Sequence, residues 1–138
     1  METMRERIEG AIDSAMKNLE TSMKALAEGN EEALRKGVWK ASADAEYALF
    51  LLSLAHEGGS KDSPWKSETS LKKLEAGPAL ALAQDLLAEA KEKMGASDLD
   101  EAYRRTWLAQ GYLLKAQTAL EKRRREDVGP DAPPPKAV

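Results

Sequence analysis

Two segments of the chain combine basic residues with a tryptophan, a pairing that can bind an anion or stack on a nucleobase. They are EALRKGVW, residues 32–39, and EAYRRTW, residues 101–107. The first contributes Arg35, Lys36 and Trp39, and the second contributes Arg104, Arg105 and Trp107. The alternative is architectural, because basic residues three or four positions before a Trp share its side of a helix and cover the apolar rim with their stems. We favour this architectural interpretation, in which each indole serves the core and its N–H finds a partner near the surface.

Other reactive side chains are scarce. The chain has no Cys, and therefore no thiolate metal site and no cysteine nucleophile. Its single histidine, His56, lies at the expected end of a helix beside Glu57, where a histidine usually satisfies terminal carbonyl groups. The Glu-x-x-His pattern of carboxylate metal sites is absent, because Ser53 lies three positions before His56. We therefore expect a non-enzymatic protein with no catalytic residue, no cofactor and no metal ion.

Composition and charge predict an all-α domain that does not coat nucleic acid. The 138 residues include 23 Ala and 18 Leu but only 3 Val and 2 Ile, and Ala and Leu favour helices over strands. The net charge is −3, with acidic and basic residues mixed along the chain. The charged fraction is 33% and Asn plus Gln total only five, a composition that favours a thermophile protein, in which ion-pair networks are common and thermolabile amides are few. No apolar run approaches the ~20 residues of a membrane span, and the N-terminus lacks an apolar signal region, so we expect a cytoplasmic protein with no membrane partner.

Apolar spacing and capping residues predict four long helices. The expected ranges are Met4–Glu28, Glu31–Glu57, Pro78–Met94 and Leu99–Glu126. Thr3 with Glu6, and Asp98 with Glu101, have the spacing of capping boxes, and Gly29 is suited to a left-handed helix end. A short extra helix is expected over Pro64–Ala76, broken by the following Gly77-Pro78.

The second helix carries two apolar stripes. One stripe comprises Leu34, Val38, Ala41, Ala45, Ala48, Leu52 and Ala55, and the other comprises Trp39, Ala43, Tyr47, Phe50 and Leu54. A helix that is apolar on two faces packs on more than one neighbour. Because the apolar area of Tyr47, Phe50 and Leu54 exceeds what a single bundle covers, we expect a homodimer or a protein partner.

The four helices are expected to form a bundle of two αα-hairpins within a single domain, residues 1–127, followed by a disordered Pro-rich tail, residues 128–138. The second and fourth helices should pair in the middle, with the first and third flanking them. A shift of 68 residues places Trp39 on Trp107 and aligns the two hairpins. The halves are therefore either a duplication or two hairpins of similar composition.

Two segments resemble known helical proteins. GNEEALRKGVWKASADAEYALFLL, residues 29–52, resembles the helix opening of small archaeal HEPN-like domains. That resemblance implies dimerisation, nucleic-acid binding or a ribonuclease with an Arg-x(4–6)-His motif. No Arg precedes His56 at that spacing, so no catalytic residue is carried over. Residues 82–116 resemble small archaeal helical-bundle proteins of unknown function.

The sequence thus predicts a non-enzymatic helical-bundle protein that acts through protein–protein contact or self-association. The alternative is a HEPN-like accessory module that binds RNA through its two basic pairs. A third hypothesis is a small-ligand pocket lined by Trp39, Tyr47, Trp107 and Tyr112. The interaction surface is expected to include Arg35, Lys36, Trp39, Tyr47, Phe50, Arg104, Arg105 and Trp107.

Overall fold

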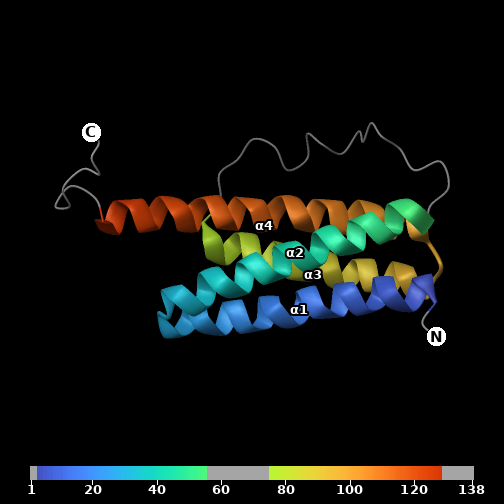
Figure 1. Cartoon of the computed structure of the whole chain (residues 1–138), viewed down its shortest axis with the longest axis horizontal. Helices are drawn as coiled ribbons and strands as arrows, with labels where there is room; N and C mark the ends of the chain where they lie inside the picture. The colour runs from blue at the N-terminus through green and yellow to red at the C-terminus, as the bar shows by residue number, and fades with distance from the viewer. Residues whose placement is uncertain (1–2, 56–74, 129–138) are drawn as a thin grey trace.

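The structure is a computed structural model that describes residues 3–55 and 75–128, with side chains in the last helix up to residue 122. The described residues form four helices, which are α1 (Met4–Glu28), α2 (Glu31–Ala55), α3 (Ala76–Gly95) and α4 (Leu99–Val128) (Figure 1). No strand occurs in these ranges. The all-α prediction is confirmed. The expected disordered tail lies outside the described residues except for Val128, which ends α4.

The hairpin of α1 and α2 begins and turns as the sequence predicted. The Thr3 hydroxyl accepts a hydrogen bond from the Glu6 amide at 3.0 Å, and the Glu6 carboxylate accepts one from the Thr3 amide at 2.9 Å. Gly29 ends α1 in the left-handed conformation, with φ of 75°. The Asn30 side chain then accepts a hydrogen bond from the Ala33 amide at 3.1 Å, which starts α2. The two-residue linker, Gly29 and Asn30, therefore fixes these two helices as antiparallel neighbours.

The start of α3 differs from the prediction. Glu75 is extended, with ψ of 157°, and the helix begins at Ala76, so that Pro78 lies inside the first turn. Proline is tolerated there, because the first amides of a helix have no intrahelical partner. The predicted break at Gly77-Pro78 is therefore wrong. Most of the predicted helix Pro64–Ala76 lies outside the described residues, and the extended Glu75 prevents it from reaching Ala76 as one helix.

The turn between α3 and α4 uses a residue with a left-handed backbone that is not glycine. α3 ends at Gly95, but the positive φ, 60°, belongs to Ser97. Asp98 then caps α4, because its carboxylate accepts a hydrogen bond from the Glu101 amide at 3.2 Å. Only this half of the predicted capping box is observed, since the Asp98 amide bonds to the Lys93 carbonyl at 2.8 Å.

The four helices form a closed square in which every helix packs on two others. The contacting pairs are α1–α2, α3–α4, α2–α4 and α1–α3. The predicted pairing of α2 with α4 is confirmed, but the prediction that α1 and α3 only flank this pair is wrong, because α1 and α3 also pack on each other and complete the ring. Neighbouring helices are antiparallel, so α2 and α3 run in the same direction on one diagonal (Figure 1). The end of α2 and the start of α3 thus lie at opposite ends of the bundle, as in four-helix bundles with one long crossover connection.

The core consists almost entirely of alanine and leucine. Buried positions include Leu19, Leu34, Leu52, Leu80, Leu87, Leu113 and Leu120, separated by alanines such as Ala15, Ala41, Ala45, Ala83, Ala109 and Ala116. None of the six aromatic residues within the described ranges is classed as buried. Small side chains allow the helices to approach closely, and the resulting core is too narrow for an aromatic ring.

The contact between α2 and α4 has the form expected at a twofold axis. Ser42 and Gln110 face each other there, and the Gln110 amide donates to the Ser42 hydroxyl at 3.1 Å. These residues are 68 positions apart, the same shift that aligns the two hairpins in the sequence. Residues nearest a twofold axis contact their own equivalents. The arrangement is therefore what two related hairpins would produce, although the sequence identity between the halves is low.

The closest approach of α1 and α2 depends on a glycine. A Cβ atom at Gly37 would collide with the Ser22 hydroxyl and would lie 3.3 Å from the Asn18 carbonyl oxygen. Nearby, the Asp44 carboxylate accepts hydrogen bonds from the Ser14 hydroxyl and the Asn18 amide, both at 2.7 Å. These contacts fix the rotation of α2 about its own axis relative to α1.

An ion pair joins α1 to α3. The ammonium group of Lys91 lies 2.7 Å from the carboxylate of Asp13. Their hydrogen bond, and then their charge attraction, raise the pKa of Lys91 above its ordinary value of 10.5. Because a raised lysine pKa favours the folded state only while the lysine is protonated, this contribution is present at neutral pH and is lost as the pH rises through the pKa of Lys91.

Replacing Gly37 by alanine should force α1 and α2 apart. We expect Gly37→Ala to lower the free energy of unfolding by about 1–3 kcal/mol, as is usual for overpacking. Ser22→Ala removes the colliding hydroxyl, so the double variant should be more stable than the Gly37→Ala chain. Urea denaturation followed by circular dichroism measures both. Equal stabilities of the single Gly37→Ala and the double variant would refute the close approach.

Alanine substitutions at two other glycines, where a Cβ would meet no neighbour, should change the free energy of unfolding in opposite directions. Gly10 and Gly29 both have open space where a Cβ would lie, but only Gly29 has a positive φ. We expect Gly10→Ala to raise the free energy of unfolding by about 0.5–1 kcal/mol, because alanine favours the helix. Gly29→Ala should lower it by about 1 kcal/mol, since a side chain strains the left-handed conformation. Thermal unfolding of the two variants checks the opposite signs.

Candidate interaction surface on helices α2 and α4

Only one of the two predicted stripes of α2 enters the bundle. The stripe that contains Val38, Ala45 and Leu52 is buried in the core. The other stripe faces outward, with exposed fractions of 65% for Trp39, 44% for Tyr47, 57% for Phe50 and 59% for Leu54. An isolated exposed leucine is ordinary, but four large apolar side chains along one helix are not.

The prediction that Trp39 serves the core is wrong. Val38, immediately before it, is fully buried, and one residue turns a helix by about 100°, which directs Trp39 outward. Opposite Trp39, α4 contributes Gln117, Glu121 and the buried Leu120, and these leave the indole 65% exposed. Trp107 is half-buried, so neither tryptophan is a core residue.

Helix α4 extends the apolar surface of α2. Gln110 is buried against Ser42 and Glu46 of α2, and its amide donates to the Glu46 carboxylate at 3.1 Å. Trp107 and Leu114 lie three and four positions from Gln110, on the outer side of this contact. Leu114 is 48% exposed. We call the outward-facing apolar set the α2/α4 face, and it consists of Trp39, Tyr47, Phe50, Leu54, Trp107 and Leu114.

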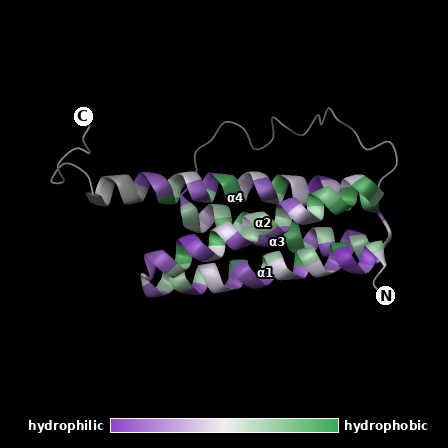
Figure 2. Ribbon diagram, viewed as in Figure 1, coloured by the Kyte–Doolittle hydropathy of each residue, from purple (hydrophilic) through white to green (hydrophobic). Residues whose placement is uncertain are grey.

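The hydropathy of the ribbon agrees with this description. Figure 2 shows hydrophobic colour along much of α2 toward its C-terminal end, whereas α1 alternates between hydrophobic and strongly hydrophilic residues. Between the apolar side chains lie small ones, since Ala43 is exposed and Gly111 is half-buried. A partner helix could therefore approach the middle of the α2/α4 face closely.

The two basic-plus-Trp elements do not form a common site. Arg35 packs beside Leu120, whereas Arg105 is 15 residues earlier on α4, a separation of about 22 Å at 1.5 Å per residue. The guanidinium of Arg105 lies 2.6 Å from Glu101 and 3.1 Å from Glu89 of α3. Arg104 also lies near Glu101, at 3.9 Å. The second basic pair therefore joins α3 to α4 and is largely neutralised.

The four aromatic residues proposed to line a small-ligand pocket are not brought together. The Tyr47 hydroxyl accepts a hydrogen bond from Arg7 of α1 at 2.9 Å, which draws it away from α4. Tyr112 packs against the core. A pocket lined by Trp39, Tyr47, Trp107 and Tyr112 is therefore not observed among the described residues.

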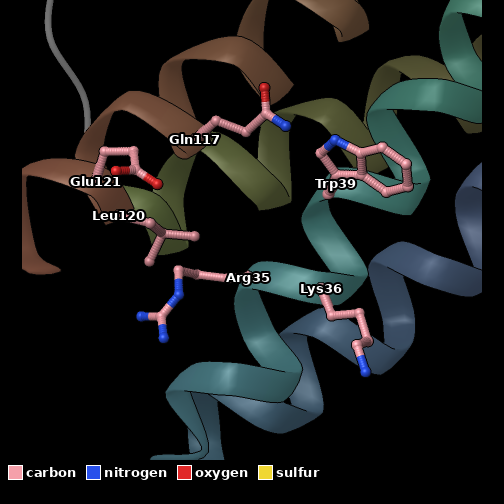
Figure 3. A pocket seen from close by; sticks show the side chains of 6 residues that line it. All are labelled: Arg35, Lys36, Trp39, Gln117, Leu120 and Glu121. Atoms are coloured by element: carbon pink, nitrogen blue, oxygen red, sulfur yellow. The ribbon is translucent and has the colours of Figure 1, made fainter.

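A different hollow lies between α2 and α4 beside Trp39. It has a volume of about 540 Å³ and is lined by Arg35, Lys36, Trp39, Gln117, Leu120 and Glu121. In Figure 3, Arg35 and Trp39 lie on the side of α2 toward α4, whereas Lys36 points away from α4. The sequence predicted the α2 side of this hollow but not the α4 side. Gln117 and Glu121 belong to no motif, and only the pairing of the two helices identifies them.

Other kinds of site find no support in the parts of the chain that the structure describes. These ranges contain no group of three or more histidine, cysteine, aspartate or glutamate residues able to hold a metal ion. None of the four helices is both long and apolar enough to cross a membrane. His56 lies outside the described residues.

Replacing Arg105 should weaken the bundle more than replacing a basic residue of the first element. We expect Arg105→Ala to lower the free energy of unfolding by about 1–2 kcal/mol, because it removes charge-assisted contacts to two helices. Lys36→Ala, at an exposed position, should change it by less than about 0.5 kcal/mol. Urea denaturation curves provide the comparison. Equal effects of the two substitutions would contradict the bridging role of Arg105.

No family model, curated protein or solved structure matches this chain. The resemblance of residues 29–52 to HEPN-like domains therefore remains a prediction. Evidence for a function has to come from the side chains and surfaces of the chain itself.

Proposed function

We propose that this protein is a non-enzymatic helical bundle that acts by associating with another protein chain, in the first instance a second copy of itself, through the α2/α4 face. The observation that supports this most directly is the exposure of Trp39, Phe50 and Leu54 along one side of α2. A group of large apolar side chains on a surface marks a site of protein contact more often than a single exposed apolar side chain does.

The narrow core explains why these residues are outside, but it does not explain why they are aromatic. A solvated helix face is stable with polar residues, and exposed aromatic residues lower solubility. Tryptophan and phenylalanine contribute disproportionately to protein interfaces, because their rings bury a large area with few rotatable bonds. Their concentration on α2 therefore favours a contact surface over an accidental one.

The area of the α2/α4 face is sufficient for an interface. A fully buried aromatic side chain removes about 150–250 Å² from water, so the exposed fractions of the face correspond to apolar area on the order of 500 Å². A standard interface buries about 800 Å² per partner, of which somewhat more than half is apolar. The face therefore supplies roughly the apolar content that one such interface requires.

The RNA-binding alternative has less support. Arg104 and Arg105 lie beside Glu101 and Glu89, and about 22 Å of helix separates them from Arg35. Nucleic-acid surfaces instead collect unneutralised basic side chains along one groove or face. Salt-sensitive RNA binding that was lost on Arg35→Ala with Lys36→Ala would favour this alternative over self-association.

The test is the mass of the chain as a function of concentration. Sedimentation or light scattering should show a mass that rises from 15.1 kDa toward twice that value. Phe50→Glu and Leu54→Glu each place a charge on the α2/α4 face. Each should move the midpoint of dimerisation to a protein concentration at least about tenfold higher, because dimerisation would then remove a carboxylate from water.

Matched controls come from exposed apolar residues on the other helices. Leu82 of α3 is 40% exposed and Met23 of α1 is 36% exposed. Leu82→Glu and Met23→Glu should leave the mass profile unchanged. A wild-type chain that remains at 15.1 kDa up to millimolar concentration would exclude self-association, and equal effects of Leu82→Glu and Phe50→Glu would exclude the α2/α4 face.

A further inference from the structure

The outermost line of α2 carries one small side chain among large ones. Ala43 is exposed on this line. Phe50 follows it on nearly the same line, because seven residues turn a helix by about 700°, only about 20° short of two full turns. Trp39 and Leu54, at the two ends, lie within about 40° of the line. The outer surface of α2 therefore has a notch at Ala43 and a ridge at Phe50.

Hydrogen bonds within the chain hold the polar side chains of this region to the two flanks of α2. The Tyr47 hydroxyl accepts a hydrogen bond from Arg7 of α1 at 2.9 Å, and the Glu46 carboxylate accepts one from Gln110 of α4 at 3.1 Å. Tyr47 is thereby directed toward α1 and Glu46 toward α4. A second helix laid along the outermost line of α2 between residues 39 and 54 would therefore meet apolar side chains.

Twofold symmetry allows two ways to set the α2/α4 face of one copy against that of another. A twofold axis parallel to the helices places α2 of one copy on α4 of the other. A twofold axis that lies in the interface and crosses the helices at a right angle places α2 on an antiparallel α2, and α4 on α4. The side chains level with Phe50 on α4 distinguish the two.

The charges of α4 favour the axis that crosses the helices. Counted eight residues in opposite directions from the contact of Ser42 with Gln110, Phe50 lies level with residue 102 of α4. Asp100, which is exposed, and Arg104, which is half-buried, lie two positions on either side of that level. An axis parallel to the helices would press Phe50 against these charged groups and remove them from water, which is costly. The other axis instead pairs apolar α2 with apolar α2.

We propose that two copies pair through antiparallel α2 helices, with Phe50 of each copy seated over the partner's Ala43. This inference rests on the proposed self-association and specifies its geometry. The same register places Trp39 on the partner's Leu54, because both pairs are centred on one point between residues 46 and 47. A small residue opposite a large one lets the two helices approach closely. A shift of one turn would lose this fit and would set Phe50 against the partner's Tyr47.

Disulfide crosslinking tests this geometry, since the chain contains no cysteine. Ala43→Cys and Phe50→Cys are made separately in the full chain and oxidised at a concentration above the dimerisation midpoint. In the proposed dimer each new cysteine lies about 10 Å along the axis from its own counterpart, whereas a disulfide joins Cα atoms about 4.4–6.8 Å apart. Neither variant should therefore crosslink with itself. An equimolar mixture should form a covalent species of twice 15.1 kDa at a rate at least about tenfold higher than either variant alone.

The matched control mixes Ala43→Cys with Leu82→Cys, whose site is exposed on α3 and lies outside the α2/α4 face. This mixture should crosslink no faster than Ala43→Cys alone. A second pair, Trp39→Cys mixed with Leu54→Cys, tests the same register and keeps Phe50 in place. It should crosslink as the first pair does.

Self-crosslinking of Ala43→Cys or Phe50→Cys at the rate of their mixture would overturn the antiparallel arrangement. The packing would also fall if sedimentation detected a dimer that Phe50→Glu weakens, yet neither mixture exceeded the control with Leu82→Cys. In that case the proposed self-association would stand without this geometry. A chain that stays at 15.1 kDa up to millimolar concentration would overturn both.

Discussion

The narrowness of the alanine- and leucine-lined core is the constraint on which the rest of the structure depends. Close helix packing requires small side chains at the contacts, and Gly37 against Ser22 is the extreme case, because no Cβ fits there. Such a core has no room for aromatic rings, so every aromatic residue within the described ranges is at least partly exposed. The described aromatic side chains consequently lie at or near the surface of this bundle, and its interior is filled by aliphatic ones.

Polar contacts give this simple core a single arrangement. Leucine and alanine specify burial but do not specify which leucine meets which, and uniform cores tend to pack loosely. In this bundle Asp44 binds two residues of α1, Gln110 binds two residues of α2, and Arg105 joins α3 to α4. Each of these contacts fails if a helix rotates or slides by one turn. Together they fix the register of helices that hydrophobic packing alone would leave free to slide.

The surface that results has two distinct parts along α2. Near its N-terminal half, Trp39 and Arg35 border the hollow with Gln117, which offers donors and a flat ring. Near its C-terminal half, Phe50 and Leu54 are exposed.

The sequence by itself determined the helices and their ends. Spacing of 3.6 residues and the capping residues Thr3, Gly29 and Asp98 are local properties, so α1 matched its prediction at both ends and α4 matched at its start. Pro78 was misjudged because its effect depends on its distance from the helix start, which Glu75 sets. The sequence also identified two stripes on α2, since periodicity defines the faces of a helix in its own frame.

Only the tertiary structure decided which stripe faces the core and what lies opposite the other. Both stripes are apolar, and the choice follows from how closely each can approach α1, a property that Gly37 and Asp44 provide on one side of the helix only. The exposure of Trp39, the pairing of Arg105 with Glu89 and the hollow beside Gln117 all join residues that are far apart in the chain. No local pattern encodes such contacts, because they depend on the rotation of whole helices against one another.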